Sequence, residues 1–473
     1  MSAVAQQVPL WSLALAKPGR EFGPTELILL SGSIPPGLQG SLYRNGPGRL
    51  QRGDQRVGHW FDGDGAILAV HFRSGQATGL YRYVQTAGYQ AEEQAGRYLF
   101  GGYGMRAKRL GQAPKNAANT SVLALPDRLL ALWEAGAPHQ LDPTTLTTRG
   151  LDSLGQTRAL PSYSAHPKRD PLTGDIYNFG VELGQKGILH LYRSNAQGQL
   201  QAHTRHPLPG LPFIHDFVLA GRYLVFLVPP VRLNPWPVLA TLKSYSDSLR
   251  WDPNQPSQVW IFDRETLQFV SRNETDPAFQ WHFGNGYEDQ DGSVIFTQVR
   301  YPDFATNRYL AEVVSGQTQT AAIAFLWQMR VDPLTGQVLQ SEPLLERGCE
   351  FPIVDPAVVG QPHRHLYLLL HRHGVDPARE LFSGVGRVDV QTGSLLEADL
   401  GAGRYPSEPL YAPDAEDPGR GWLLSLVFDG HQNRSQVWIW DAAELDGDPC
   451  CRLELPEPIP LGFHGTWRAY PPG

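Results

Sequence analysis

Cysteine is scarce in this chain. Cys349, Cys450 and Cys451 are the three cysteines among 473 residues, two of them adjacent and none in a CxxC spacing. Three cysteines, two of them adjacent, make a poor disulfide framework, and their spacing matches no local zinc motif. We therefore predict a cytoplasmic protein.

Long hydrophobic runs and an excess of positive charge are also missing. The longest apolar runs, LVFLVPPV, LYLLL and LLSLVF, fall far short of the roughly 20 residues that cross a bilayer as a helix. The formal net charge is −7, and no polybasic run occurs. We expect neither a transmembrane helix nor a nucleic-acid partner.

Turn-forming residues, in contrast, are abundant. Glycine and proline, with 49 and 40 residues, exceed their usual share of about 12%. Phrases such as DPLTGDI, VDPLTGQV and DVQTGSL recur between short runs of branched and aromatic residues such as QVWIFD and QVWIWD. Each phrase predicts two strands joined by a turn.

Hairpins repeated through the whole length are typical of a β-propeller. We predict an all-β fold with one propeller domain over residues 21–473 and a loose N-terminal arm over residues 1–20. At roughly 40 to 50 residues per blade, the length allows seven blades. Loops and short helices should cap the face that carries the functional site.

Four histidines stand in unusual local phrases: His166 in YSAHPKRDPLTGD, His215 in FIHDFVL, His282 in FQWHFGNGYED and His464 in GFHGTW. A single histidine of this kind more often belongs to the core or the surface. In a propeller, however, strands from separate blades converge on one axis, so that distant histidines can meet. Four imidazoles leave two positions free on an octahedral ion, although nitrogen ligands alone do not choose between iron, zinc and copper.

Three glutamates lie beside apolar or aromatic residues: Glu134 in LLALWEAGAPHQ, Glu350 in CEFPIV and Glu408 in YPSEPLY. An unpaired carboxylate in such surroundings would be costly. A metal-bound imidazole donates its second ring N–H to an acceptor, which fixes its tautomer. The glutamates are candidates for this task, and ordinary salt bridges are the alternative.

These phrases, in order along nearly the whole chain, resemble the carotenoid cleavage oxygenase family, and within it the cyanobacterial apocarotenoid oxygenases. The family also contains the retinal pigment epithelium isomerase and the lignostilbene dioxygenases. The resemblance rests further on GSIPPGLQGSLYRNGPG, HWFDGDGAIL, NAANTSVLAL and PSEP. Two departures, Phe283 after the third histidine and Gly286 after Asn285, remove no ligand.

The resemblance implies a seven-bladed propeller with Fe(II) on its axis. It implies that the four histidines bind the iron and that Glu134, Glu350 and Glu408 bond to three of them. The implied reaction cleaves a conjugated C=C bond of a carotenoid or apocarotenoid with dioxygen and gives two carbonyl products, retinal-like apocarotenals.

The position before the first glutamate bears on the substrate. The lignostilbene branch is similar but carries a lysine there, which helps to bind a phenolic hydroxyl, whereas this chain has Trp133. An indole cannot make that contact, so we favour a linear polyene. Six aromatic residues beside the motifs are predicted to line an apolar tunnel for it, with core packing as the alternative for each: Phe61, Trp133, Phe213, Trp281, Phe351 and Phe463.

Residues 228–245 interrupt the rhythm of strands. Leu233, Trp236 and Leu239 are spaced so that they can share a helical face. We hypothesise a peripheral contact of this patch with a membrane leaflet, and packing beneath the propeller cap is the alternative.

Two other functions stay open on the sequence alone. One is the cleavage of a stilbene or phenylpropenoid by the same chemistry. The other is a metal-free propeller that binds a partner protein or carries a polyene without cutting it.

Overall fold

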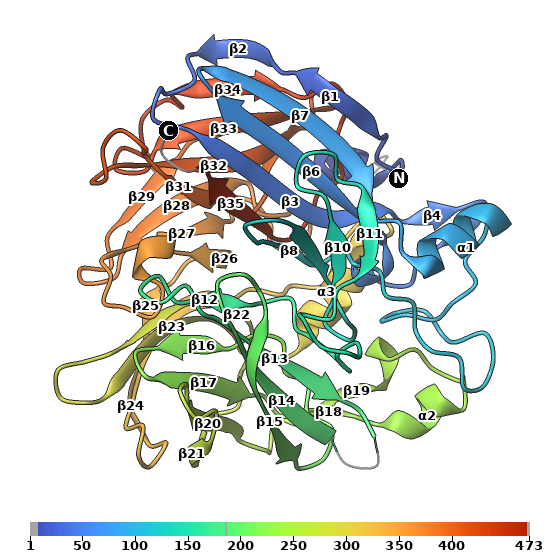
Figure 1. Ribbon diagram of the computed structural model, residues 1–473, viewed down its shortest axis with the longest axis vertical. Helices are drawn as coiled ribbons and strands as arrows, with labels where there is room; N and C mark the ends of the chain where they lie inside the picture. Colours follow the sequence, from blue (N-terminus) through green and yellow to red (C-terminus); the bar gives the residue numbers. More distant parts are fainter. Residues whose placement is uncertain (1–7, 185–186, 471–473) are drawn as a thin grey trace, which may run out of the picture.

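The computed structural model describes residues 8–184 and 187–470 as an all-β propeller (Figure 1). Three α-helices occur in this part of the chain: α1 (Ala87–Ala95), α2 (Pro235–Leu239) and α3 (Ala305–Val313). It also holds four 3-10 turns: η1 (Leu10–Leu15), η2 (Trp60–Asp62), η3 (Ser246–Ser248) and η4 (Pro356–Val358). No helix in these ranges is long and apolar enough to cross a membrane.

Three sheets have four antiparallel strands each. The first contains β11 (Thr148–Leu151), β10 (His139–Leu141), β9 (Leu129–Leu132) and β8 (Ser121–Ala124). The second contains β12 (Lys168–Arg169), β13 (Ile176–Glu182), β14 (Gly187–Ser194) and β15 (Leu200–Leu208). The third contains β26 (Cys349–Ile353), β27 (His365–Leu370), β28 (Gly384–Asp389) and β29 (Leu395–Ala398). Two short ribbons lie outside the sheets: β4 (Gln51–Arg52) with β5 (Gln55–Arg56), and β18 (Val231–Leu233) with β19 (Leu249–Trp251).

Two further sheets combine strands from both ends of the chain. One contains β1 (Phe22–Glu26), β7 (Gln76–Tyr83), β6 (Asp64–Arg73), β3 (Gly40–Arg49) and β35 (Gly465–Ala469). The other contains β2 (Ile28–Gly32), β34 (Cys451–Glu454), β33 (Arg434–Asp441), β32 (Gly421–Asp429), β30 (Arg404–Pro406) and β31 (Leu410–Pro413). In Figure 1 the dark red β35 lies beside the blue β3. This pairing joins the C-terminal strand to the N-terminal sheet and so closes the ring of the propeller.

The remaining large sheet has eight strands in the order β21 (Phe269–Thr275), β20 (Ser257–Asp263), β17 (Tyr223–Val228), β16 (Val218–Ala220), β22 (Phe279–Glu288), β23 (Val294–Tyr301), β24 (Phe325–Val331) and β25 (Val338–Leu345). The predicted seven blades do not appear as seven separate sheets, because the described residues form six sheets of four or more strands. The cause is a parallel contact between β16 and β22 at Ala220 and Gly286, which joins two antiparallel groups. A side chain at Gly286 would bring its Cβ within 2.4 Å of Val218 Cγ1, so glycine permits this approach.

The recurring turn phrases form one repeated structure. In each, the glycine N–H donates to the carbonyl oxygen of the aspartate four residues earlier, at 2.8 Å: Gly174 to Asp170, Gly336 to Asp332 and Gly393 to Asp389. The three glycines have positive φ angles of 76°, 72° and 70°, which favour residues without a Cβ. The phrases read as turns in the sequence therefore do join consecutive strands.

The N-terminal stretch is not loose where the structure describes it. Trp11 in η1 is fully buried, and its indole N–H donates to the carbonyl oxygen of Arg379 at 3.0 Å. Leu15 is buried in the same hydrophobic cluster. Burial of a tryptophan in the core anchors this segment, and residues 1–7 of the predicted arm lie outside the described part of the chain.

Candidate metal centre

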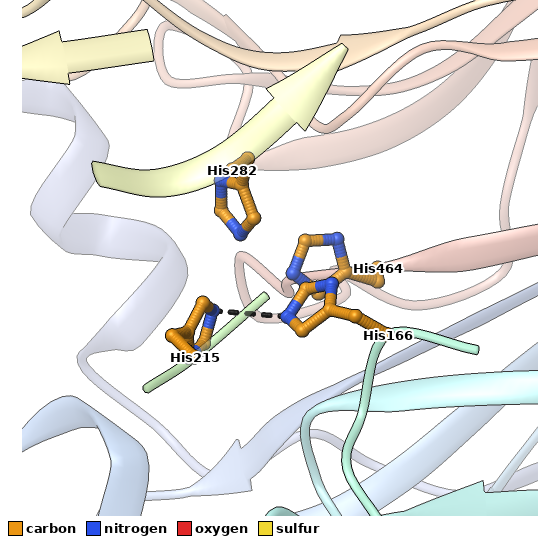
Figure 2. A group of neighbouring side chains, drawn as sticks. All are labelled: His166, His215, His282 and His464. Atoms are coloured by element: carbon orange, nitrogen blue, oxygen red, sulfur yellow. Dashed lines mark hydrogen bonds between the residues drawn. The ribbon is translucent and has the colours of Figure 1, made fainter. Parts of the chain in front are cut away.

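The four histidines predicted from separate phrases lie together, as Figure 2 shows. His166, His215 and His464 come one to three residues before strands β12, β16 and β35, and His282 lies within β22. All four are buried, and their potential ligand atoms lie within 4.8 Å of one another. Strands from four different regions of the chain therefore bring one imidazole each to the same place.

The ring nitrogens suit a divalent transition metal. His166 Nε2 and His215 Nε2 are 2.9 Å apart, and His282 Nε2 is buried without a hydrogen-bond partner among the described residues. Nitrogen ligands about 2.1 Å from one ion cannot be more than about 4.2 Å apart. The observed limit of 4.8 Å thus requires only a small inward movement to accommodate an ion.

The three predicted glutamates lie against three of the histidines. Glu350 accepts from His282 Nδ1 at 2.5 Å, and Glu408 accepts from His464 Nδ1 at 2.8 Å. The Glu134 carboxylate contacts His215 Nδ1, without the alignment of a hydrogen bond. An acceptor at Nδ1 holds the proton there and leaves the lone pair of Nε2 free for a metal.

Glu350 is itself held by two donors. The Tyr301 hydroxyl donates to its Oε1 at 3.1 Å, and the Phe351 N–H donates to its Oε2 at 2.6 Å. Phe351 adopts a left-handed backbone with φ 54°, which is rare for a residue with a bulky side chain. Such a conformation persists only where its surroundings enforce it, as at functional sites.

Glu408 is positioned by a buried arginine that the sequence did not reveal. Arg44 donates to the carbonyl oxygens of Glu408 and Phe463 at 2.6 and 2.7 Å, and its Nη2 is 4.0 Å from the Glu408 carboxylate. The N–H of Gly465 donates to the same carboxylate at 2.9 Å. Burial lowers the pKa of Arg44 to about 10, against the opposing effect of Glu408.

Burial keeps two of these rings, His166 and His464, neutral. It lowers the pKa of His166 well below the ordinary value, and the neighbouring rings, His215 first among them, add to the effect. It also lowers the pKa of His464, against the opposing attraction of Glu408. At His282 burial acts in the same direction, but the Glu350 carboxylate outweighs it and raises the pKa. Neutral His166 and His464 are the forms that bind metals.

An apolar cavity of about 430 Å³ reaches the cluster, a volume within the roughly 300 to 1,000 Å³ of common ligand pockets. His215, His282 and His464 stand in its wall. So do all six aromatic residues predicted from the sequence: Phe61, Trp133, Phe213, Trp281, Phe351 and Phe463. The Trp281 ring packs 4.8 Å from His215, and the Phe351 ring 5.1 Å from His282, between ring centroids. The aromatic wall thus continues up to the histidines. Sequence reasoning missed other aromatic members of this wall, such as Tyr103 and Tyr245.

Helix α2 and the segment after it contribute to the same cavity through Val238, Leu239 and Lys243. Trp236 and Leu239 are 75% and 62% exposed, as expected for a surface patch. Leu233 is not part of that patch: it lies in β18, is 8% exposed and packs in the core. The helix begins at Pro235, after Leu233. The orientation of the Leu233 side chain is therefore set by strand β18 and not by the helix.

Comparison with known proteins finds relatives whose similarity extends over nearly the whole chain. The Synechocystis apocarotenoid-15,15'-oxygenase is 33% identical over 457 residues, covering 93% of this chain and 92% of the relative. The Arabidopsis thaliana carotenoid 9,10(9',10')-cleavage dioxygenase 1 is 28% identical over 94% of this chain and 87% of the relative. The Aspergillus fumigatus resveratrol cleavage oxygenase 1 is 27% identical over 95% and 94%.

Solved structures of one of these relatives have the same fold as this chain. A Synechocystis apocarotenoid oxygenase variant superposes with a TM-score of 0.89 at 30% identity, covering 98% of each chain. A cobalt-substituted form of that enzyme gives a TM-score of 0.87 with the same identity and coverage. The model of the retinal pigment epithelial membrane protein family matches residues 15–469. The resemblance seen in the sequence is therefore confirmed, and the chain belongs to this family of carotenoid oxygenases.

Proposed function

We propose that this protein is an Fe(II)-dependent oxygenase that cleaves one conjugated C=C bond of a linear apocarotenoid or carotenoid. The observation that carries the proposal is a cluster of four buried histidines, three of which stand in the wall of an aromatic-lined cavity. The named activities of the Synechocystis and Arabidopsis relatives support the substrate class.

In this proposal His166, His215, His282 and His464 bind the iron through their inward-facing nitrogens. Glu134, Glu350 and Glu408 hold the protons of three rings at Nδ1 and keep those rings oriented. Bound Fe(II) supplies a site for dioxygen, and four neutral ligands leave its double charge uncancelled. The cobalt-substituted relative supports a divalent ion at such a site.

The protein's own contribution to the reaction is to bind, orient and exclude water. Phe61 and Phe213 each pack against Trp281, with ring centroids 5.5 and 5.7 Å from that of the indole. They offer flat apolar faces to a polyene and hold one double bond near the histidines. In the overall reaction the C=C bond and the O–O bond break and two C=O bonds form. Both oxygen atoms enter the products, so no reductant is required.

We propose a polyene rather than a stilbene because Trp133 occupies the cavity wall next to Glu134. Its side chain extends the apolar surface and offers no cation to a phenolic oxygen. The resveratrol-cleaving relative keeps the stilbene alternative open to test.

We also propose a cytoplasmic protein whose residues 21–473 form one domain and whose exposed residues beside the cavity contact a membrane leaflet. The patch consists of Trp236, Leu239 and Leu242, which are 62 to 75% exposed. A polyene would then pass from lipid to the cavity without crossing water. Liposome flotation tests this: Trp236→Ser with Leu239→Ser should abolish flotation, and unchanged flotation would contradict it. Leu334→Ser, at a leucine 69% exposed on a turn between β24 and β25, is the matched control.

Product analysis tests the main proposal. Iron-loaded protein is incubated under ¹⁸O₂ with apocarotenals of several lengths and, in parallel, with resveratrol. We expect two carbonyl fragments from an apocarotenal, each with one ¹⁸O when solvent exchange is suppressed, and none from His282→Ala. Recovery of every polyene unchanged would indicate a carrier, and cleavage of resveratrol alone would favour the stilbene alternative.

A further inference from the structure

His166 differs from the other three histidines in its surroundings. Each of the others has a glutamate against its Nδ1. Among the described residues, the acidic side chain within 4.0 Å of a His166 ring nitrogen is that of Asp216, whose Oδ1 is 4.0 Å from His166 Nδ1. Asp216 directly follows His215 and is 1% exposed.

The Asp216 carboxylate connects three of the segments that carry the histidines. Its Oδ1 forms an ion pair with Lys168 Nζ at 2.9 Å, and Lys168 lies two residues after His166. The same oxygen accepts a hydrogen bond from the Phe217 N–H at 2.8 Å. The other oxygen, Oδ2, accepts one at 3.0 Å from the N–H of Phe283, the residue directly after His282. One short side chain therefore fixes the segments of His166, His215 and His282 relative to one another.

The chemistry of this group suits positioning rather than ligation. A buried carboxylate is costly unless paired, and here an ammonium and two backbone N–H groups compensate it. Lys168 and Asp216 together carry no net charge, so the pair leaves the charge of a bound metal unchanged. An aspartate side chain has few rotamers, so its carboxylate is held in a defined place. Because its partners lie within two residues of the histidines, a small displacement of the carboxylate would also move the imidazole rings.

We propose that Asp216, compensated by Lys168, is a positioning residue that sets the spacing of His166, His215 and His282 and supplies the carboxylate that faces His166. The proposal rests on the four-histidine metal site proposed above. Nothing in the sequence motifs assigns this role to Asp216, which sits beside a ligand as an isolated charge in the apolar run FIHDFV.

Cobalt binding provides a test that does not depend on activity. Co(II) is titrated into the metal-free protein, its visible absorption is recorded, and its affinity is measured against a chelator. We expect Asp216→Asn to weaken binding by about tenfold and to change the Co(II) spectrum, because outer partners orient the ligands. Lys168→Met keeps the carboxylate and its backbone bonds and should change the spectrum in the same direction.

Asp152→Asn is the matched control. Asp152 is also buried, pairs with Arg128 Nε at 2.6 Å and accepts the Leu154 N–H at 2.7 Å, but neither partner is adjacent in sequence to one of the four histidines. It should lower the unfolding temperature of the metal-free protein without altering cobalt affinity or spectrum. Wild-type affinity and spectrum in both Asp216→Asn and Lys168→Met, or equal changes in the control, would overturn the inference. Failure of the unaltered protein to bind Co(II) would instead contradict the metal site itself.

Discussion

Replacement of Glu350 by glutamine removes one charge from the metal centre while keeping its shape. Glu350 Oε2 receives the His282 Nδ1–H at 2.5 Å and the Phe351 N–H at 2.6 Å, and Oε1 receives the Tyr301 hydroxyl at 3.1 Å. The glutamine oxygen can accept the first two bonds, and its amide can donate to the tyrosine oxygen. The change thus tests the carboxylate charge rather than the packing.

The expected loss follows from the role of such partners. Outer carboxylates are worth about 10 to 100-fold in metal affinity, which corresponds to about 1.4 to 2.7 kcal/mol. Glu350→Ala should cost more than Glu350→Gln, because it leaves the buried Nδ1–H of His282 and the Phe351 N–H without an acceptor.

The assay is competition between the protein and a chelator for Fe(II) or Co(II) at fixed pH, with thermal unfolding of the metal-free form as a check on folding. Tyr301→Phe is the control, since it removes only the 3.1 Å bond to Glu350 and should reduce affinity by about fivefold or less. A Glu350→Gln affinity equal to that of the unaltered protein would refute the role of the carboxylate.

Three further changes probe stability and specificity. Arg44→Met should lower the free energy of unfolding by about 3 kcal/mol in urea titrations, because two buried carbonyls lose their donor; a loss below about 1 kcal/mol would contradict this. Trp133→Lys should increase turnover of phenolic stilbenes relative to apocarotenals, measured side by side, and an unchanged ratio would count against the role of this position. Burial raises the pKa of Asp62 to about 6, so the folded state binds its proton more tightly and loses stability as pH rises from about 4 to above 6. Asp62→Asn should remove about 2 kcal/mol of that loss in unfolding measured at pH 4.5 and 7.5, and an equal pH dependence in both proteins would be incompatible with this.

Local patterns in the sequence were sufficient for much of the fold. The Asp–Gly turn phrases predicted hairpins because their hydrogen bonds close within four residues, as between Asp170 and Gly174. The number of sheets was not predictable in this way. It depends on the contact of Ala220 with Gly286, residues far apart along the chain whose pairing no local pattern specifies.

The candidate site shows the same division. Its histidines and glutamates stand in sequence phrases distinctive enough to identify them as candidate site residues. The residues that position them do not stand in such phrases. Arg44 looks like an ordinary strand residue, although it is 3% exposed and holds two carbonyls near the metal centre. The spacing of Leu233 predicts a place on a helical face, but the helix starts after this residue. Asp216 offered a signal, an isolated acid in an apolar run, that was visible in the sequence without revealing its three partners.

The most direct test of the central claim is the iron content of purified protein, measured by elemental analysis after anaerobic loading with Fe(II) and removal of free metal. We predict about one iron atom per chain in the unaltered protein and almost none in His282→Ala or His464→Ala, since each loses an inward-facing imidazole. His365→Ala, which changes a histidine on β27 outside the cavity wall, should retain its iron. Iron retained near one atom per chain in the His282→Ala protein would contradict the assignment of the four histidines as the metal centre.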